Sequence, residues 1–112
     1  MADNTAMLSL LGLCKRANKL SCGHDAATGA IRSGQAKLCI LSSDSSQRLR
    51  EEMQREITMK KSDIPLVVSD STMDEIGHAT SLRSAVLTVN DSGFAESVSK
   101  LIKTERREEN EC

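Results

Sequence analysis

The sequence predicts an α/β fold, a three-layer α/β/α sandwich whose sheet is mixed, mostly parallel and made of about four strands. Two observations predict it. Helical and extended patterns alternate along the whole chain with short links between them, and the 112-residue length suits a single domain. Such alternation is typical of a mostly parallel sheet covered on both faces, with right-handed crossovers.

The first element is a helix followed by a short strand. Apolar residues spaced three and four positions apart predict a helix over residues 7–17, and either Asn4 or Thr5 is suited to cap it. Residues 19–22 then form a short extended segment that ends at Gly23. We therefore expect this strand to be brief.

A second helix and a buried strand come next. The helix is expected over residues 25–33, because Gly34 is a typical C-terminal stop. Residues 38–41 are all apolar, which indicates a strand buried on both faces. Turn and capping residues at 42–46 lead into a charged helix that ends near residues 60–61.

Two further strands enclose a short helix. Pro65 opens the strand at residues 66–68. Thr72–Glu75 has the pattern of a capping box, which predicts a helix start, and that helix continues to Ala79. Residues 85–89 are the last expected strand.

The chain is expected to close with a helix and a tail. Asn90 and Asp91 are suited to cap the helix, whose apolar face runs from Phe94 to Ile102. We expect residues 1–104 to form one domain and the charged residues 105–112 to form a flexible tail.

Composition first argues against nucleic-acid binding. Phe94 is the single aromatic residue, which excludes modules that stack bases on aromatic rings. The formal net charge is −1, whereas phosphate binding normally needs a basic excess. The charges are segregated, however: residues 1–61 carry a net +4 and residues 62–112 a net −5. We expect the basic half to carry an anion-binding site and the acidic half to point elsewhere.

The cysteines and the N-terminus indicate a cytoplasmic protein without membrane segments. No signal-peptide pattern is present, and the four cysteines, which lack C-x-x-C spacing, are expected to be free thiols. Cys14 and Cys39 lie among apolar neighbours and are expected in the core. Cys22 and His24 alone are too few ligands for structural zinc, so we expect neither a metal nor a cofactor.

No catalytic motif is present, so we expect a non-catalytic protein. The chain has no nucleophile elbow, no P-loop, no dinucleotide fingerprint and no zinc-protease motif. His24 and His78 are the only histidines, and neither has an evident nucleophile partner.

Two loops are candidate binding sites. In the first, Gly23, His24 and Asp25 open a helix whose unpaired N–H groups suit phosphate oxygens or base edges. Gly29 lies in mid-helix, where tight packing or clearance for a bound strand would explain it. The second is the loop that precedes the last strand. It contains Ser81, Leu82 and Arg83, so an apolar side chain stands beside a cation.

Several segments resemble the L7Ae family of kink-turn RNA-binding ribosomal proteins, in particular its bacterial YlxQ-like members. The resemblance covers residues 7–98 and is most specific over residues 34–44. The matching segments are Leu10–Ala17, Lys19–Gly23, Ala30–Asp44, Glu75–Ala79 and Asn90–Ala95.

The resemblance implies an α/β/α sandwich and RNA binding by the two loops singled out above. One is the start of the second helix, which enters the kinked RNA, and the other packs an apolar residue near an extruded base. The family's contact pattern is Gly-x-Asn-Glu-x-x-Lys, of which this chain keeps only Gly23, with Asp25, Ala26 and Gly29 at the other positions. The lost contacts are expected to weaken binding, by on the order of 1–3 kcal/mol each.

The expected partner is structured RNA such as ribosomal RNA or the ribosome, bound by a monomer, with no DNA or membrane partner. Lys19 and Arg32 are expected to replace some of the lost charge. The candidate RNA-binding residues are Lys19, Gly23, His24, Asp25, Ala26, Gly29, Arg32, Ser81, Leu82 and Arg83. Two other interpretations remain open: a protein-interaction module that kept the fold and lost kink-turn binding, and the substrate-binding domain of an RNA methyltransferase.

Overall fold

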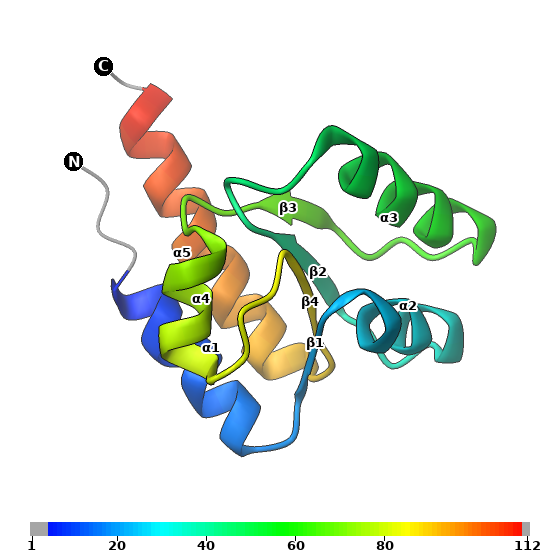
Figure 1. Ribbon diagram of the computed structural model, residues 1–112, viewed down its shortest axis with the longest axis horizontal. Coiled ribbons are helices and arrows are strands. Elements are labelled where there is room, and N and C mark those ends of the chain that lie inside the picture. Colours follow the sequence, from blue (N-terminus) through cyan, green and yellow to red (C-terminus); the bar gives the residue numbers. More distant parts are fainter. Residues whose placement is uncertain (1–4, 111–112) are drawn as a thin grey trace.

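The computed structural model describes the backbone of residues 5–110 and the side chains of residues 5–102. Helices and strands alternate within these residues, as expected (Figure 1). The helices are α1 (Thr5–Arg16), α2 (His24–Ser33), α3 (Gln47–Met59), α4 (Met73–Thr80) and α5 (Ser92–Asn110), and the strands are β1 (Leu20–Cys22), β2 (Leu38–Leu41), β3 (Leu66–Val68) and β4 (Val86–Val89).

Local sequence signals account for most element boundaries. The capping box at the start of α4 is present, with Thr72 and Glu75 bonding each other's backbone N–H groups. Thr5 is the first residue of α1 rather than its cap, and Asn4 lies outside the described residues. Helix α5 continues to Asn110, through most of the segment that was expected to be a tail.

The sheet is mixed and has four strands, but it is not mostly parallel. The strand order is β1-β4-β2-β3. Strand β2 pairs with β3 in parallel, whereas β4 pairs antiparallel with both β1 and β2. Strands β1, β2 and β3 therefore run in one direction, as alternation predicts, and the last strand enters between β1 and β2 in the opposite direction.

The reversal of β4 follows from the short helix α4. Its eight residues pack against α1 instead of returning across the sheet. The chain thus enters β4 at the end where β1 and β2 finish, as two backbone hydrogen bonds show: Gly23 N–H donates to the Val86 carbonyl, and Ser42 N–H donates to the Ala85 carbonyl, both at 2.9 Å. The loops that follow β1 and β2 and precede β4 consequently gather at one end of the sheet.

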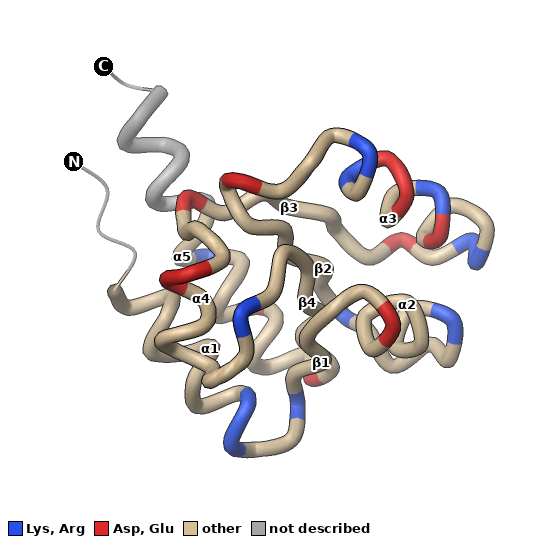
Figure 2. Tube along the Cα trace, viewed as in Figure 1, with Lys and Arg blue, Asp and Glu red and all other residues tan. Residues whose placement is uncertain are grey.

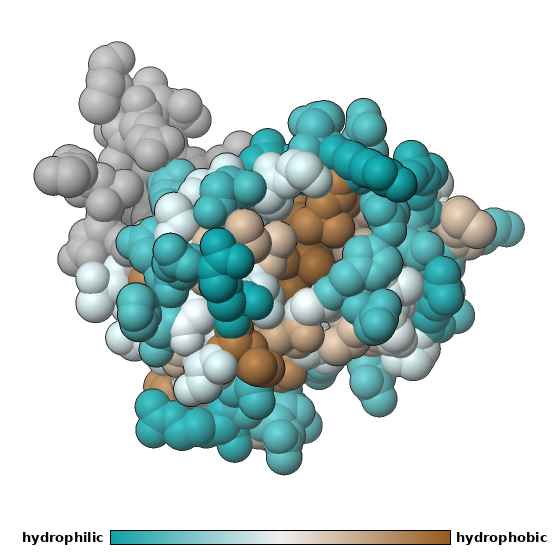
Figure 3. Space-filling view, viewed as in Figure 1, coloured by the Kyte–Doolittle hydropathy of each residue, from teal (hydrophilic) through white to brown (hydrophobic). Residues whose placement is uncertain are grey.

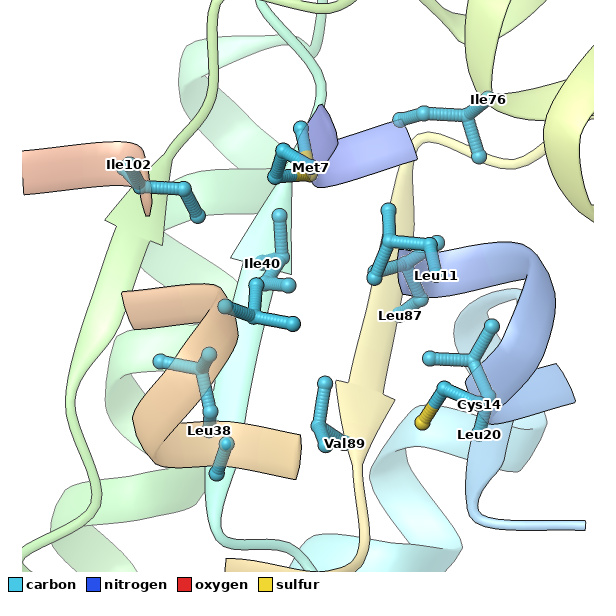
Figure 4. Close-up of a cluster of buried hydrophobic side chains, with 12 residues drawn as sticks. Met7, Leu11, Cys14, Leu20, Leu38, Ile40, Ile76, Leu87, Val89 and Ile102 are labelled. Carbon is cyan, nitrogen blue, oxygen red and sulfur yellow. The ribbon is translucent and has the colours of Figure 1, made fainter. Parts of the chain in front are cut away.

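Two hydrophobic clusters hold the three layers together. One lies between the sheet and the layer of α1, α4 and α5 and includes Met7, Leu11, Ile40 and Leu87 (Figure 4). The other lies between the sheet and α2 and α3. Its members include Ile31. Strand β2 is buried at every position, as expected, because its side chains alternate between the two clusters.

The core cysteines behave as small apolar residues. Cys14 and Cys39 are buried free thiols, as expected. Burial raises the pKa of Cys14 to about 11 and that of Cys39 to about 12, so both stay protonated at neutral pH. Phe94 is partly buried and packs against the first cluster.

Candidate RNA interface

The two candidate loops lie side by side. Gly23, which ends β1 and opens α2, donates its N–H to the carbonyl of Val86 at the start of β4. The loop of Ser81, Leu82 and Arg83 leads directly into that strand, and it passes between α4 and α2 (Figure 1). Residues separated by almost 60 positions thus form one surface.

The start of α2 is open. Gly23 occupies the N-cap position with φ of +96°, which favours glycine, and no side chain caps the helix. The first backbone N–H groups of a helix have no partner within it, and the positive end of the helix dipole lies there. Among the described residues, this helix start is therefore left available for an acceptor or an anion.

The outer face of α2 is bare. Asp25, Ala26 and Gly29 are all exposed, and a Cβ atom added at Gly29 would meet nothing within 4 Å. The explanation of Gly29 by tight packing is therefore wrong. This face presents a short carboxylate, a methyl group and a bare backbone, with open space around residue 29.

Two side chains of α2 are bound to α3 rather than free. Arg32 makes two hydrogen bonds of 3.0 Å to the Glu56 carboxylate. His24 hydrogen-bonds Glu52 and lies 3.5 Å from the Asp25 carboxylate. These partners, Glu52 first, raise the pKa of His24, and Arg32 lowers the pKa of Glu56. Both side chains thus tie α2 to α3, and the charge of Arg32 is paired with a carboxylate.

Hydrogen bonds of the Thr80 hydroxyl hold the loop before β4 around Leu82. The Thr80 hydroxyl lies 2.8 Å from the Ile76 carbonyl and accepts a hydrogen bond of 3.3 Å from Leu82 N–H. Ser81 has φ of +71°, in the left-handed region that favours glycine. Within this frame Leu82 remains 47% exposed, and Leu13 and Met59 are the other exposed large apolar residues of the described chain.

Arg83 is held against α4. Its Nε lies 2.6 Å from Asp74 Oδ1, and Asp74 raises the pKa of the guanidinium. A Cβ atom added at Gly77 would lie 3.2 Å from Arg83 Cα, so the glycine lets the loop pack closely on the helix. Arg83 is nevertheless mostly exposed and stands beside Leu82.

Residues 5–99 match the family described as the ribosomal protein L7Ae/L30e/S12e/Gadd45 family. The chain belongs to this L7Ae family. A solved structure of a Bacillus halodurans protein of unknown function is 32% identical, with a TM-score of 0.76 over 87% of this chain and 96% of that one. A 15.5 kDa RNA-binding protein of Giardia lamblia shares the fold, with 16% identity and a TM-score of 0.64 over 89% and 84% of the two chains. No significant match was found among curated proteins.

In this L7Ae-family chain, two of the expected contact residues lie apart from the rest. Lys19 precedes β1, and its carbonyl accepts from Asn90 N–H beyond the far end of β4, so the length of β1 separates it from Gly23. Arg32 is in the last turn of α2, opposite the helix start. The structure therefore brings together the start of α2 and the loop of Ser81, Leu82 and Arg83, but not Lys19 and Arg32.

The basic half and the acidic half of the sequence are not separated in the folded chain. Ser81, Leu82, Arg83 and Asp74 all come from the acidic half of the L7Ae-family chain, yet they form one side of the site. Figure 2 shows basic residues at the end of α1, ahead of β1 and in the loop before β4, with acidic residues on α4 to one side of them and at the start of α2 on the other.

Sequence reasoning missed three carboxylates that shape the site. Glu52 and Glu56 engage His24 and Arg32, and Asp74 engages Arg83. No sequence signal marks these pairs, because each depends on how two helices or a helix and a loop pack. The Gly77 signal was present, since a glycine within a helical pattern often marks close packing.

The described residues contain no group of three or more His, Cys, Asp or Glu side chains suited to hold a metal ion. No helix among them is long and apolar enough to cross a membrane. The visible face in Figure 3 is largely hydrophilic, with an apolar area between α3 and β3. Leu49 of α3 and Leu66 and Val68 of β3 are partly buried members of the second cluster.

Proposed function

We propose that this L7Ae-family chain binds structured RNA through the start of α2 and the loop of Ser81, Leu82 and Arg83. One observation carries the proposal: Gly23, at the uncapped start of α2, is hydrogen-bonded to Val86 at the start of β4, the strand into which the loop with half-exposed Leu82 leads. Membership of a family of ribosomal proteins and the shared fold of an RNA-binding protein support it.

Each part of the surface has a distinct role in the proposal. The N–H groups at the start of α2 donate to phosphate oxygens or base edges of an RNA that bends sharply, as a kink-turn does. Leu82 packs against a base that has left the stack, and Arg83 exchanges Asp74 for a phosphate. Unstacked bases in loops and bulges are the usual targets of sequence-specific RNA recognition.

Binding is expected to be weaker than the family pattern implies. Asp25 only accepts hydrogen bonds when ionised, where the family's Asn also donates, and Gly29 supplies no cation. His24 and Arg32 do not compensate, because both are paired with α3. We propose that the chain acts without catalysis, as a cytoplasmic monomer, on ribosomal RNA or on another RNA with a kink-turn-like bend.

Fluorescence anisotropy with a labelled kink-turn RNA and with a straight duplex of the same composition tests this proposal. The chain should bind the kink-turn RNA at low salt and prefer it over the duplex. Leu82→Ser should weaken kink-turn binding by roughly ten-fold, since burying a leucine side chain against a base contributes about 1.5–3 kcal/mol when the burial is complete. Met59→Ser is the control, because Met59 is also a large exposed apolar residue, at 78%, but lies at the end of α3.

Two results would contradict the proposal. One is the absence of binding at low salt to either the kink-turn RNA or bulk ribosomal RNA, which would favour the interaction-module alternative. The other is equal loss of affinity in Leu82→Ser and Met59→Ser. A pull-down whose partners survive ribonuclease treatment would identify the alternative directly.

A further inference from the structure

We propose that the RNA backbone also runs along a groove between the C-terminal ends of α1 and α4, where Lys15 and Arg16 bind its phosphates. This inference rests on the proposed function and extends its surface beyond the loops already described. The groove has a volume of about 400 Å³. Its lining residues are Gly12, Lys15, Arg16, Ala79, Thr80 and Ser81.

The close approach of α1 and α4 shapes this groove. A Cβ atom added at Gly12 would lie only 2.9 Å from the Ala79 carbonyl oxygen, so the two helices touch through backbone at this point. Beyond the contact the helices end, at Arg16 and Thr80, and the groove opens between their last turns. Its walls are therefore set by packed backbone.

The groove is continuous with the candidate RNA interface on two sides. Ser81 lines it, and the next residue along the chain is Leu82. On the other side, Lys15 is near enough to Cys22 to lower the pKa of that thiol, against the larger effect of burial, and Cys22 directly precedes Gly23. An RNA that contacts Leu82 and Gly23 would thus have its backbone beside the groove.

Lys15 and Arg16 form no ion pair with any described residue. Among the described residues, His24, Arg32 and Arg83 each have a carboxylate partner, whereas Lys15 and Arg16 have none within 4 Å. A cation that binds a phosphate displaces counterions from the RNA, which favours binding. A cation without a carboxylate partner does so without first losing an ion pair. The available positive charge therefore lies on the α1 side of the loop, not on α2.

This arrangement offsets the loss on α2. The family pattern has a lysine where this chain has Gly29, and the bare outer face of α2 offers no cation before the paired Arg32. Lys15 and Arg16 supply two charges on the opposite flank of Leu82. We infer that the cations that bind phosphates in this chain are mainly Lys15 and Arg16 of α1.

A structural role for the same residues needs a control. Cations in the last turn of a helix stabilise it through the helix dipole, whatever the protein binds. Lys60 and Lys61 provide the comparison, since they are two adjacent exposed cations directly after the end of α3. The test compares Lys15→Gln/Arg16→Gln with Lys60→Gln/Lys61→Gln, so that both variants lose two positive charges.

Anisotropy titrations with the kink-turn RNA, repeated at several KCl concentrations, give the affinity and its salt dependence. For Lys15→Gln/Arg16→Gln we expect affinity at about 0.1 M salt to fall ten-fold or more, and the slope of log affinity against log salt to flatten by about 1 to 2, as expected for two lost phosphate contacts. For Lys60→Gln/Lys61→Gln the affinity should change by less than about three-fold and the slope should stay the same.

Two results would overturn the inference while leaving the proposed function intact. One is a wild-type chain that binds the RNA together with a Lys15→Gln/Arg16→Gln variant of unchanged affinity and slope. The other is equal loss in both double variants, which would indicate a general charge effect. A wild-type chain that binds no RNA would overturn both proposals at once. Cooperative urea unfolding of both variants, with the m-value of the wild type, shows that a loss of affinity is not a loss of folding.

Discussion

The protonation of His24 affects the stability of the contact between α2 and α3. This histidine stands at the first position of α2, hydrogen-bonded to Glu52 on α3 and 3.5 Å from Asp25, and its side chain is 47% exposed. These carboxylates raise its pKa, so the protonated form stabilises the fold more than the neutral form does. The α2–α3 contact beside the proposed interface therefore depends on pH.

The stabilisation by His24 should be lost as pH rises. A pKa that is raised in the folded state gives a contribution that is complete below the unfolded-state value of about 6.5 and disappears as pH passes the folded-state value. Urea unfolding of wild type and His24→Ala should differ more at about pH 5.5 than at about pH 8.5, by less than about 1 kcal/mol for so exposed a pair.

Glu52→Gln provides the control for this measurement, because Glu52 is the first of the partners that raise the pKa of His24. In the Glu52→Gln background, His24→Ala should produce a smaller pH-dependent difference. A His24→Ala effect that grows with pH would contradict the sign argued here.

The bare outer face of α2 makes a gain of affinity testable. Asp25→Asn, Ala26→Glu and Gly29→Lys together restore the family pattern on a surface where the new side chains meet no obstacle at residue 29. We expect the triple variant to bind a kink-turn RNA at least about ten-fold more tightly, since each restored contact is worth on the order of 1–3 kcal/mol. The measurement is anisotropy with the same RNA.

Gln35→Lys controls for charge in that experiment. It adds the same net charge at an exposed position after α2, away from the helix start. An unchanged affinity in the triple variant would show that the outer face of α2 does not touch the RNA. An equal gain in both variants would attribute the effect to charge alone.

At the scale of elements, the approach of α1 to α4 is the contact that sets the geometry of the site. It holds α4 at one end of the sheet, directs the loop of Leu82 and forces β4 to enter between β1 and β2. Gly12 permits the contact, and Gly77 lets the loop fold back onto α4. The positions of these two glycines therefore decide where the exposed leucine stands.

The same substitution should have opposite effects in two helices. Gly29→Ala adds a Cβ that meets nothing within 4 Å, and it should raise the free energy of unfolding by about 0.5–1 kcal/mol. Gly12→Ala puts a Cβ 2.9 Å from the Ala79 carbonyl oxygen, so it should lower the free energy of unfolding despite the same gain in helix propensity, because overpacking costs about 1–3 kcal/mol.

Urea unfolding monitored by circular dichroism measures both variants. Equal m-values would confirm that the changes reflect stability and not the extent of unfolding. Stabilisation by both substitutions would contradict the close helix contact.

The elements themselves could be predicted from local patterns, whereas their arrangement could not. The apolar run at residues 38–41 and the capping box at Thr72 specified their elements through neighbours in the chain. The antiparallel entry of β4 depends on whether a short helix crosses the sheet or stays at its end, which no local pattern encodes. A mostly parallel sheet was therefore expected in error.

Some features of the candidate site could likewise be predicted from local patterns, whereas others depend on tertiary packing. Gly23, Ser81 and Leu82 could be found from turn chemistry and exposure, and the structure brings their loops together. The pairing of Arg32 with Glu56 could not be found, since the partners are 24 positions apart and meet only when α2 packs on α3. Charge counting along the sequence thus overstated the cations available at the helix start.

At the scale of the whole molecule, we expect RNA binding to depend on the shape of the RNA more than on the total charge of the protein. The net charge is −1, and among the described residues of the site several cations are held by carboxylates. The remaining features are open N–H groups, one exposed leucine and the unpaired cations at the end of α1. Such a surface suits a bent RNA that meets all three features at once.

The most direct test of the central claim is a titration of the ¹⁵N-labelled chain with kink-turn RNA, followed by nuclear magnetic resonance. The account predicts that the largest amide shifts fall on residues 23–26 and 81–83, with little change on α3 and α5. Shifts concentrated on α3 or α5, or a spectrum unchanged by saturating RNA at low salt, would contradict it.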